Sequence, residues 1–196
     1  MIFLCAIVGY LLGSVSTSTL VVRWAANLDI RQHGSGNAGA TNTLRVLGLR
    51  YALLVLAVDI LKGMAAVGMG HVLGRGDPWA VYAAGLAAIV GHNWPVFFGF
   101  RGGKGVATTI GVLALVMFTP AALTGAIAIA LVALTRYVSL GALTFTALTP
   151  VAAMLLGYPW AKVAFAVIVA ALSIYRHRQN IGRLRRGEEH KVFSKS

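Results

Sequence analysis

Three short polar segments contain the side chains best suited to bind an anion. They are residues 33–45 (HGSGNAGATNTLR), 99–108 (GFRGGKGVAT) and 175–185 (YRHRQNIGRLR). Each combines arginine or lysine with small residues, hydroxyls or amides, which are groups that proteins use to hold phosphate. Because the stretches between them are apolar and long enough to cross a bilayer, we predict a membrane-embedded site for phosphorylated small molecules.

The first segment is typical of a loop that binds an anion through its backbone. Its glycines allow successive N–H groups to converge on one anion, and the stretch 41–47 predicts a short helix whose N-terminus points at the same place. Arg45, one helical turn beyond Thr41, can add charge. The predicted binding residues are Ser35, Gly36, Asn37, Gly39, Thr41, Asn42 and Arg45. The alternative is a flexible linker, which would not need an arginine at helical spacing.

The second segment places Lys104 between glycines at the start of a predicted helix. It is not a Walker phosphate loop, because Gly105 follows the lysine where serine or threonine should stand. The lysine would act as a point charge and the helix end as a partial positive charge, so we predict that Gly103 and Lys104 bind substrate. A basic turn at the cytoplasmic face is the alternative. His92, shortly upstream, suits packing and function equally.

The third segment holds His177, the best-placed group that titrates near neutral pH. On a helix it shares a face with Asn180, three residues further on. The alternative is the basic end of the last span, with side chains that extend to the headgroups. Ser139, which follows Arg136 and Tyr137, is predicted either to give a hydroxyl to the same site or to cap a helix.

The rest of the chain predicts the architecture. With 58% hydrophobic residues and a mean hydropathy of +0.80, we expect an all-α integral membrane protein, a bundle of seven transmembrane helices that forms one domain over residues 1–196. The predicted spans are residues 2–24, 51–73, 78–98, 105–118, 120–135, 139–156 and 160–176. Glycine and proline fall between them. The fourth and fifth are short and could also be read as one span.

The distribution of basic residues predicts that the N-terminus lies outside and the C-terminus in the cytoplasm. In this orientation fourteen of the seventeen Lys and Arg residues, Lys195 among them, fall inside, and only Arg75 and Lys162 fall outside. All three polar segments then lie at the cytoplasmic face. The remaining lysine, Lys62, lies within a span three residues after Asp59, where a structural ion pair is favoured over a substrate role.

Composition argues against several other kinds of site. The net charge of +12 does not indicate nucleic acid here, because basic loops of membrane proteins follow the positive-inside rule and meet anionic headgroups. The single cysteine, Cys5, allows no disulfide within the chain. The five histidines are scattered and the carboxylates are few, so no metal site and no cofactor are expected.

Taken together, these residues resemble the acyl-phosphate-dependent glycerol-3-phosphate acyltransferases of bacterial membranes, the PlsY family. The resemblance covers essentially the whole chain and shows no departure at the matching positions. It is carried, in order, by residues 34–42 with Arg45, 59–63 (DILKG), 91–99 (GHNWPVFFG), 102–108, 136–140 (RYVSL) and 176–181 (RHRQNI). Each piece is short, but the ordered set is specific.

The resemblance implies transfer of a fatty acyl group from acyl phosphate to the sn-1 hydroxyl of glycerol 3-phosphate, the first step of bacterial phospholipid synthesis. The products would be lysophosphatidic acid and phosphate. It also implies that the first glycine-rich loop binds phosphate, that the loop of Lys104 holds glycerol 3-phosphate, and that His177 and Asn180 are the catalytic residues. The expected location is the bacterial cytoplasmic membrane, and the enzyme that makes acyl phosphate is a candidate partner.

The general base is open between His177 and a phosphate of the substrate. An acyl phosphate is already activated, so positioning and charge stabilisation can carry most of the catalysis. No Ser-His-Asp arrangement is evident in the sequence, which disfavours a covalent acyl-enzyme.

Two rival interpretations belong to other classes. The HxxxxD signature of acyl-CoA-dependent glycerolipid acyltransferases is missing, since none of the five histidines has Asp five residues later. A transporter of phosphate or organophosphate would also need anion-binding loops in a helical bundle, but transporters often have internal repeats and sites near the midplane. A scaffolding membrane protein would leave the glycine-rich loops unexplained.

Overall fold

Every regular element of residues 1–192, the part of the chain that this computed structural model describes, is a helix. Lys195, counted above with the inner basic residues, lies outside the described residues. The helices group into two compact units, Met1–Val116 and Met117–Ser196, called here the first and second unit. The single domain expected from the sequence stays a prediction.

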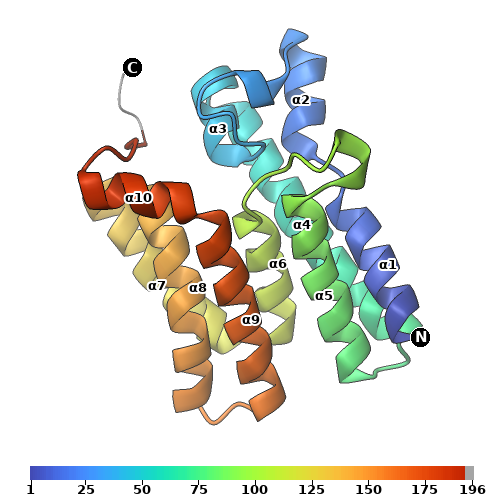
Figure 1. Ribbon diagram of the computed structural model, residues 1–196. Helices are drawn as coiled ribbons and strands as arrows, with labels where there is room; N and C mark the ends of the chain where they lie inside the picture. Colours follow the sequence, from blue (N-terminus) through green and yellow to red (C-terminus); the bar gives the residue numbers. More distant parts are fainter. Residues whose placement is uncertain (193–196) are drawn as a thin grey trace. The chain divides into compact units, whose positions relative to one another are not determined.

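The first unit holds six α-helices and two short 3-10 helices (Figure 1). In chain order they are α1 (Ile2–Gly13), α2 (Thr17–Ala26), η1 (Ile30–Gln32), α3 (Ala40–Leu47), α4 (Leu49–Leu73), α5 (Pro78–Asn93), η2 (Val96–Phe98) and α6 (Val106–Val116). The long apolar helices are joined by short turns, whereas the polar segments 33–39 and 99–105 form the loops before α3 and α6. This arrangement leaves the predicted anion-binding groups at helix ends.

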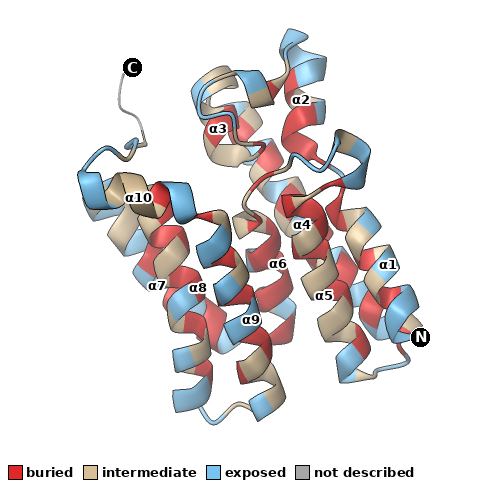
Figure 2. Cartoon of the chain, in the orientation of Figure 1, coloured by how far each residue is buried: buried red, intermediate tan, exposed pale blue. Residues whose placement is uncertain are grey.

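Small residues let the helices of the first unit pack with their backbones nearly touching. A methyl group on Gly9 or Gly13 of α1 would collide with the carbonyl oxygen of Ala84 or Ala88 of α5. On the other side of the unit, a methyl on Gly111 of α6 would collide with a backbone carbonyl of α4. Packing through glycine and alanine is what membrane helices use where the hydrophobic effect cannot drive association. Figure 2 shows the buried sides of these helices in red.

The sequence predicts one helix over residues 2–24, but the structure interrupts it between α1 and α2. The backbone carbonyl of Val15, at this break, accepts a hydrogen bond of 2.8 Å from Nζ of Lys62 in α4. Lys62 also pairs with Asp59 at 2.8 Å, so the predicted ion pair forms. The break exists because a buried ammonium group needs oxygen partners, and a carbonyl inside an intact helix would already be used.

The second unit contains four helices, α7 (Phe118–Thr135), α8 (Val138–Leu155), α9 (Trp160–Arg176) and α10 (Arg178–Arg186). Buried hydroxyls connect the first three. The hydroxyl oxygens of Thr124 in α7 and Thr149 in α8 lie 3.0 Å apart, and Thr146 of α8 donates to the hydroxyl of Ser173 in α9 at 3.1 Å. Such hydrogen bonds between helices are typical of membrane bundles.

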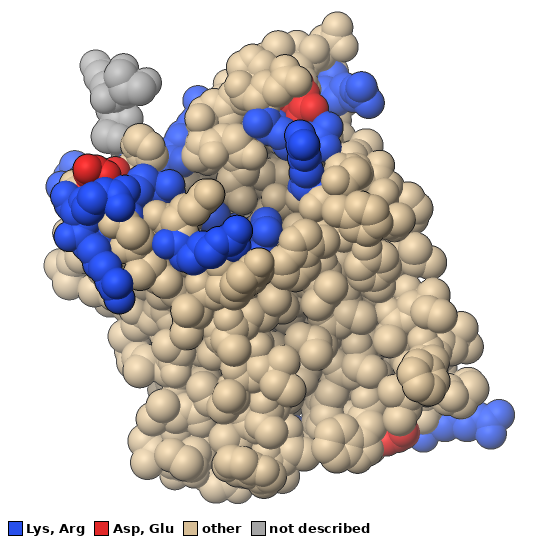
Figure 3. All heavy atoms as spheres, in the orientation of Figure 1, with Lys and Arg blue, Asp and Glu red and all other residues tan. Residues whose placement is uncertain are grey.

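The outer sides of the helices suit lipid. Large apolar side chains are widely exposed, as shown by Phe3 at 86% and Leu134 at 84%. On the face seen in Figure 3, charged side chains lie toward the helix ends rather than over the middle of the helices. Five helical stretches are long and apolar enough to cross a membrane, or six if α9 and α10 count as one bent span. With eleven residues, α6 rises about 16 Å, which is short of a bilayer core of about 30 Å. The count of seven spans and the orientation stay predictions.

The close contact of α1 with α5 gives a stability prediction. We expect Gly13→Ala to lower the free energy of unfolding by about 1–3 kcal/mol, because the added methyl must push the backbone of Ala88 away. Gly68→Ala is the matched control, since nothing lies within 4 Å of its added methyl. Thermal unfolding of both variants in detergent measures the difference, and equal melting temperatures would contradict this account of the packing.

Candidate active site

The first glycine-rich loop is held in shape by one buried amide. Asn42 of α3 is fully buried, and its Oδ1 accepts a hydrogen bond of 2.8 Å from the backbone N–H of Ser35. Its Nδ2 donates to the backbone oxygens of Ile30 and His33. The loop can fold back over Asn42 because Gly34 has a φ of +59°, a conformation that favours glycine. The predicted contact of Asn42 with substrate stays a prediction, and the structure gives this residue an ordering role.

The other predicted residues of this loop surround the start of α3. Ser35 and Gly36 are exposed, while Asn37, Gly39 and Thr41 are half-buried. Gly39 is the N-cap of α3, so the first N–H groups of the helix lie among these residues. Arg45 is exposed one turn further along the same helix. Donors at a helix N-terminus with an arginine on the next turn form a geometry that attracts an anion.

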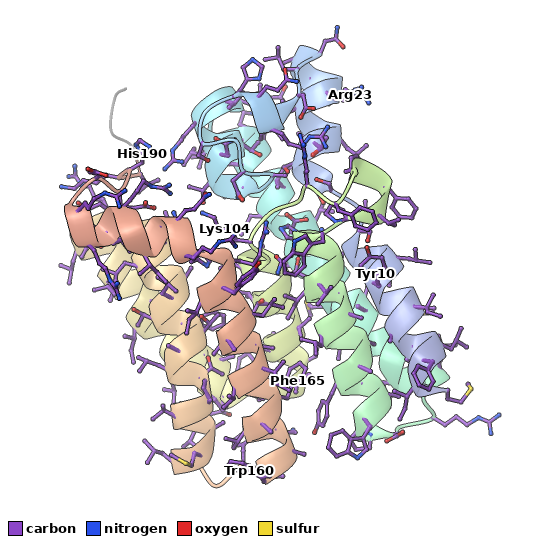
Figure 4. The ribbon with its side chains drawn as sticks, in the orientation of Figure 1. Tyr10, Arg23, Lys104, Trp160, Phe165 and His190 are labelled. Carbon is purple, nitrogen blue, oxygen red and sulfur yellow. The ribbon has the colours of Figure 1, made fainter. Side chains whose placement is uncertain are left out.

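The second glycine-rich loop lies beside the first within the same unit. A methyl group on Gly103 would collide with the backbone oxygen of Ala38, so the two loops touch there. Arg31 of η1 makes a second connection through a hydrogen bond of 2.8 Å from Nη1 to the backbone oxygen of Phe98. Lys104, labelled in Figure 4, is half-buried just before α6. The structure therefore brings together two segments about sixty residues apart in the sequence.

Arg31 is itself fixed by a carboxylate that the sequence did not single out. Its guanidinium contacts both carboxylate oxygens of Asp29, with the shortest distance 2.7 Å. Hydrogen bonds from the Arg31 side chain, more than any other cause, lower the pKa of Asp29 from 3.8 to about 2. The pair holds the arginine in the orientation that reaches Phe98, so Asp29 contributes to the junction of the two loops.

In the second unit, His177 lies at the bend between α9 and α10. The axes of the two helices differ by 62°, and His177 is buried with 2% of its surface exposed. Its Nδ1 lies 2.8 Å from the backbone oxygen of Ser173. Because a carbonyl oxygen can only accept, Nδ1 carries the hydrogen, and Nε2 is the basic nitrogen of the neutral ring.

Asn180 and Ser139 meet at a carboxylate, Glu189, that sequence reasoning missed. Oε1 of Glu189 accepts hydrogen bonds from Nδ2 of Asn180 at 2.6 Å and from Oγ of Ser139 at 2.8 Å. Its Oε2 accepts from Nε of Arg183 at 2.7 Å. Ser139 is the second residue of α8, whose N-cap is Tyr137, so the helix-cap alternative for this serine is wrong. The scarcity of acidic residues, five in the chain, was the one available signal.

The chain after α10 folds back to bring Glu189 to this position. The backbone N–H of Val192 donates to the backbone oxygen of Arg136 at 2.8 Å, and Nζ of Lys191 lies 5.6 Å from the centre of the Tyr137 ring. Burial raises the pKa of Glu189, but the hydrogen bonds from Asn180, Ser139 and Arg183 outweigh it, and the net shift is downward. Glu189 is therefore ionised at neutral pH and fixes Asn180.

Groups that could hold a metal ion are not gathered in residues 1–192. No three side chains of His, Cys, Asp or Glu lie close enough together there to coordinate one. The described chain instead has donors to anions in the first unit, and in the second unit His177 beside Ser173 and Asn180 beside Glu189.

Known proteins share this sequence and this fold. The sequence profile of a family described as glycerol-3-phosphate acyltransferase matches residues 3–187. A glycerol-3-phosphate acyltransferase of Halalkalibacterium halodurans is 54% identical over 198 residues, which cover 98% of this chain and 96% of that protein. One from Shouchella clausii is 53% identical over 192 residues, covering 95% and 94%.

Two crystal structures of PlsY (YgiH), an integral membrane glycerol 3-phosphate acyltransferase, are similar to this chain. The glycerol 3-phosphate form has a TM-score of 0.91 and 40% identity, and covers 97% of this chain and 94% of that one. The lysophosphatidic acid form has a TM-score of 0.88 and 39% identity, with the same coverage.

The fold, the apolar outer surfaces and these similarities define an integral membrane enzyme made of helices. The profile match spans nearly the whole chain, and the relatives share more than half of its residues. The chain belongs to the glycerol-3-phosphate acyltransferase family.

The Glu189 contacts predict a pH-dependent contribution to stability. A carboxyl whose pKa is lower in the folded protein stabilises the fold fully above its ordinary value of 4.5, and this contribution is lost as the pH falls through the folded pKa. We expect Glu189→Gln to be less stable than the unaltered protein at pH 7, and the difference to shrink below about pH 4.

Glu188→Gln is the matched control, because Glu188 is exposed and its ion pair is with Arg186, which is exposed as well. Melting temperatures in detergent from pH 7 to pH 4 measure both variants. If Glu188→Gln and Glu189→Gln behave alike, the carboxylate of Glu189 does not anchor the tail.

Proposed function

We propose that the enzyme transfers a fatty acyl group from acyl phosphate to the sn-1 hydroxyl of glycerol 3-phosphate. The products are lysophosphatidic acid and inorganic phosphate, and the reaction takes place at the inner face of the bacterial cytoplasmic membrane as the first step of phospholipid synthesis. The observation that carries the proposal is the pair of glycine-rich loops that touch between Ala38 and Gly103, because two phosphorylated substrates need two adjacent anion sites.

Each loop has a proposed substrate. Gly103 and Lys104 bind the phosphate of glycerol 3-phosphate, and the crystal structure of PlsY in its glycerol 3-phosphate form supports a site for this molecule in the shared fold. The loop before α3 binds the phosphate of the acyl donor through its backbone N–H groups and nearby side chains. Those residues are Ser35, Gly36, Asn37, Gly39, Thr41 and Arg45, with Asn42 holding the loop in shape.

The proposed step is a direct acyl transfer. The sn-1 oxygen forms a bond to the acyl carbon, the bond between that carbon and the phosphate oxygen breaks, and phosphate leaves with the bonding electrons. The hydroxyl proton passes to Nε2 of His177, which is basic because Nδ1 donates to the oxygen of Ser173. Asn180, fixed by Glu189, orients the reacting group, and Ser139 shares that carboxylate. Phosphate is a good leaving group, so the acyl donor needs no prior activation. Positioning therefore supplies much of the acceleration.

The choice of donor tests the proposal. Purified protein in detergent or lipid mesophase is given glycerol 3-phosphate with either palmitoyl phosphate or palmitoyl-CoA, and phosphate and lysophosphatidic acid are measured. We expect turnover only with palmitoyl phosphate, and phosphate release that requires both substrates. Equal or faster turnover of palmitoyl-CoA would contradict the donor, and acylation at the sn-2 position would contradict the regiochemistry. Uptake of labelled glycerol 3-phosphate into vesicles without acylation would indicate a transporter.

The binding role of Lys104 predicts a separation of kinetic constants. Lys104→Ala should raise the KM for glycerol 3-phosphate about tenfold or more, because a charge that holds the phosphate is lost, while the KM for palmitoyl phosphate changes little. Lys162→Ala is the control, since Lys162 lies near the start of α9 and contacts the Tyr158 ring. An unchanged KM for glycerol 3-phosphate would remove Lys104 from the binding site.

The proposed base predicts the opposite separation. His177→Gln should lower kcat about 100-fold or more with little change in either KM, which is the usual cost of removing a general base. His190→Gln is the control, because His190 is exposed in the tail after α10 (Figure 4). If His177→Gln keeps a kcat close to that of the unaltered enzyme, a substrate phosphate is the proton acceptor.

A further inference from the structure

A buried histidine in the first unit, His92, connects the ion pair of the membrane interior to the Lys104 loop. It lies near the end of α5 with 7% of its surface exposed. Neither the proposed binding groups nor the proposed base include it. Its ring has one nitrogen on the side of Asp59 and the other against Gly103, so it lies between a fixed charge and the loop that holds substrate.

The Asp59 side of the ring is rigid. Asp59 has 1% of its surface exposed, and its Oδ1 takes a hydrogen bond of 2.8 Å from the hydroxyl of Thr17 and lies 2.8 Å from Nζ of Lys62. Nδ1 of His92 is 3.8 Å from the same oxygen. Lys62 is held in turn by the carbonyl of Val15. The carboxylate is therefore fixed by α2, by α4 and by the break between α1 and α2, and the imidazole lies next to it.

The loop side of the ring leaves no spare room. A methyl group on Gly103 would collide with Nε2 of His92, and one on Gly102 would collide with the backbone oxygen of the same histidine. The backbone N–H of Gly103 donates to that oxygen at 3.1 Å. The loop thus rests on the ring and the main chain of His92, and Lys104 is the next residue along.

We propose that His92 is a positioning residue for glycerol 3-phosphate. Its imidazole lies beside Asp59 and packs against Gly103, and so sets where the ammonium group of Lys104 and the start of α6 meet the phosphate. This inference rests on the proposed function, in which the Lys104 loop holds glycerol 3-phosphate. His92 acts through the loop and does not itself touch the substrate.

Two substitutions separate the sides of the ring. Glutamine places a polar group near the position of Nε2, whereas asparagine reaches only as far as Nδ1 and leaves the space under Gly103 empty. We expect His92→Asn to raise the KM for glycerol 3-phosphate about tenfold with kcat changed less than about threefold, and His92→Gln to stay within about threefold of the unaltered enzyme in both constants. His71→Gln, on an exposed part of α4, is the control.

A double substitution tests whether His92 acts through Lys104. If it does, His92→Asn should change the KM less than about twofold when Lys104→Ala is already present, because the effects of residues in one chain of contacts do not add. If the two substitutions together raise the KM by the product of their separate effects, the proposal is overturned. An unchanged KM in His92→Asn would also overturn it. If His92→Asn does not fold, His92→Ser replaces it, because serine also leaves the space beside Gly103 empty.

A binding measurement separates this inference from the proposed function. The rise in melting temperature caused by glycerol 3-phosphate reports binding without turnover. We expect the same rise in the unaltered protein and in His92→Gln, and a smaller rise in His92→Asn at the same concentration of glycerol 3-phosphate. An active enzyme in which all three show the same rise overturns the inference alone. Absence of both turnover and any rise in the unaltered protein overturns the proposed function and the inference with it.

Discussion

A bilayer core supplies no hydrogen-bond partners, and this constraint shapes the whole molecule. Every charged or polar group within the spans must be satisfied by the protein itself. Asp59 and Lys62 show the consequence, since their buried pair draws in the hydroxyl of Thr17 and opens the helix at Val15 to free a carbonyl. Glycine and alanine at several points of contact between helices allow the close approach that membrane helices need.

Polar chemistry is concentrated where this constraint is relaxed, at the helix ends. There the chain uses one buried side chain to order each functional group of the two units. The amide of Asn42 makes hydrogen bonds to the backbone of the first glycine-rich loop. The carboxylate of Glu189 accepts hydrogen bonds from Asn180, Ser139 and Arg183. Both residues hold their neighbours in one geometry, and such preorganisation is what a site for group transfer requires.

Local features of the sequence were predictable because they follow from short-range rules. Apolar length and Gly/Pro breaks placed α9 at residues 160–176, as the structure has it, and the i, i+3 spacing of Asp59 and Lys62 predicted their ion pair. Donor-rich glycine loops at helix starts were also recognisable from residue types alone. Family resemblance added the reaction and the roles of residues, and membership of the family is confirmed by the comparisons.

Features that depend on contacts distant in sequence were not predictable in this way. The break after α1 falls in residues 13–19 (GSVSTST), but the group that uses the freed carbonyl, Lys62, is 47 residues from Val15 and could not be read from that stretch. Ser139 donates a hydrogen bond to Glu189, which lies fifty residues later in the chain after α10. The sequence of that segment indicates only a charged end of the chain. Asn42 was expected to bind substrate, because an asparagine beside glycines can either bind an anion or hold the loop backbone in shape. Its burial in the folded loop shows that it orders the backbone.

The central claim is that acyl transfer is direct, between two phosphorylated substrates and without an acyl-enzyme. A rapid-quench experiment with palmitoyl phosphate labelled in the acyl chain, at an enzyme concentration comparable to the substrate, tests it most directly. Without glycerol 3-phosphate, the account predicts no burst of phosphate and no label on the denatured protein. A burst of phosphate equal to the enzyme present, with label retained on the chain after denaturation, would contradict it.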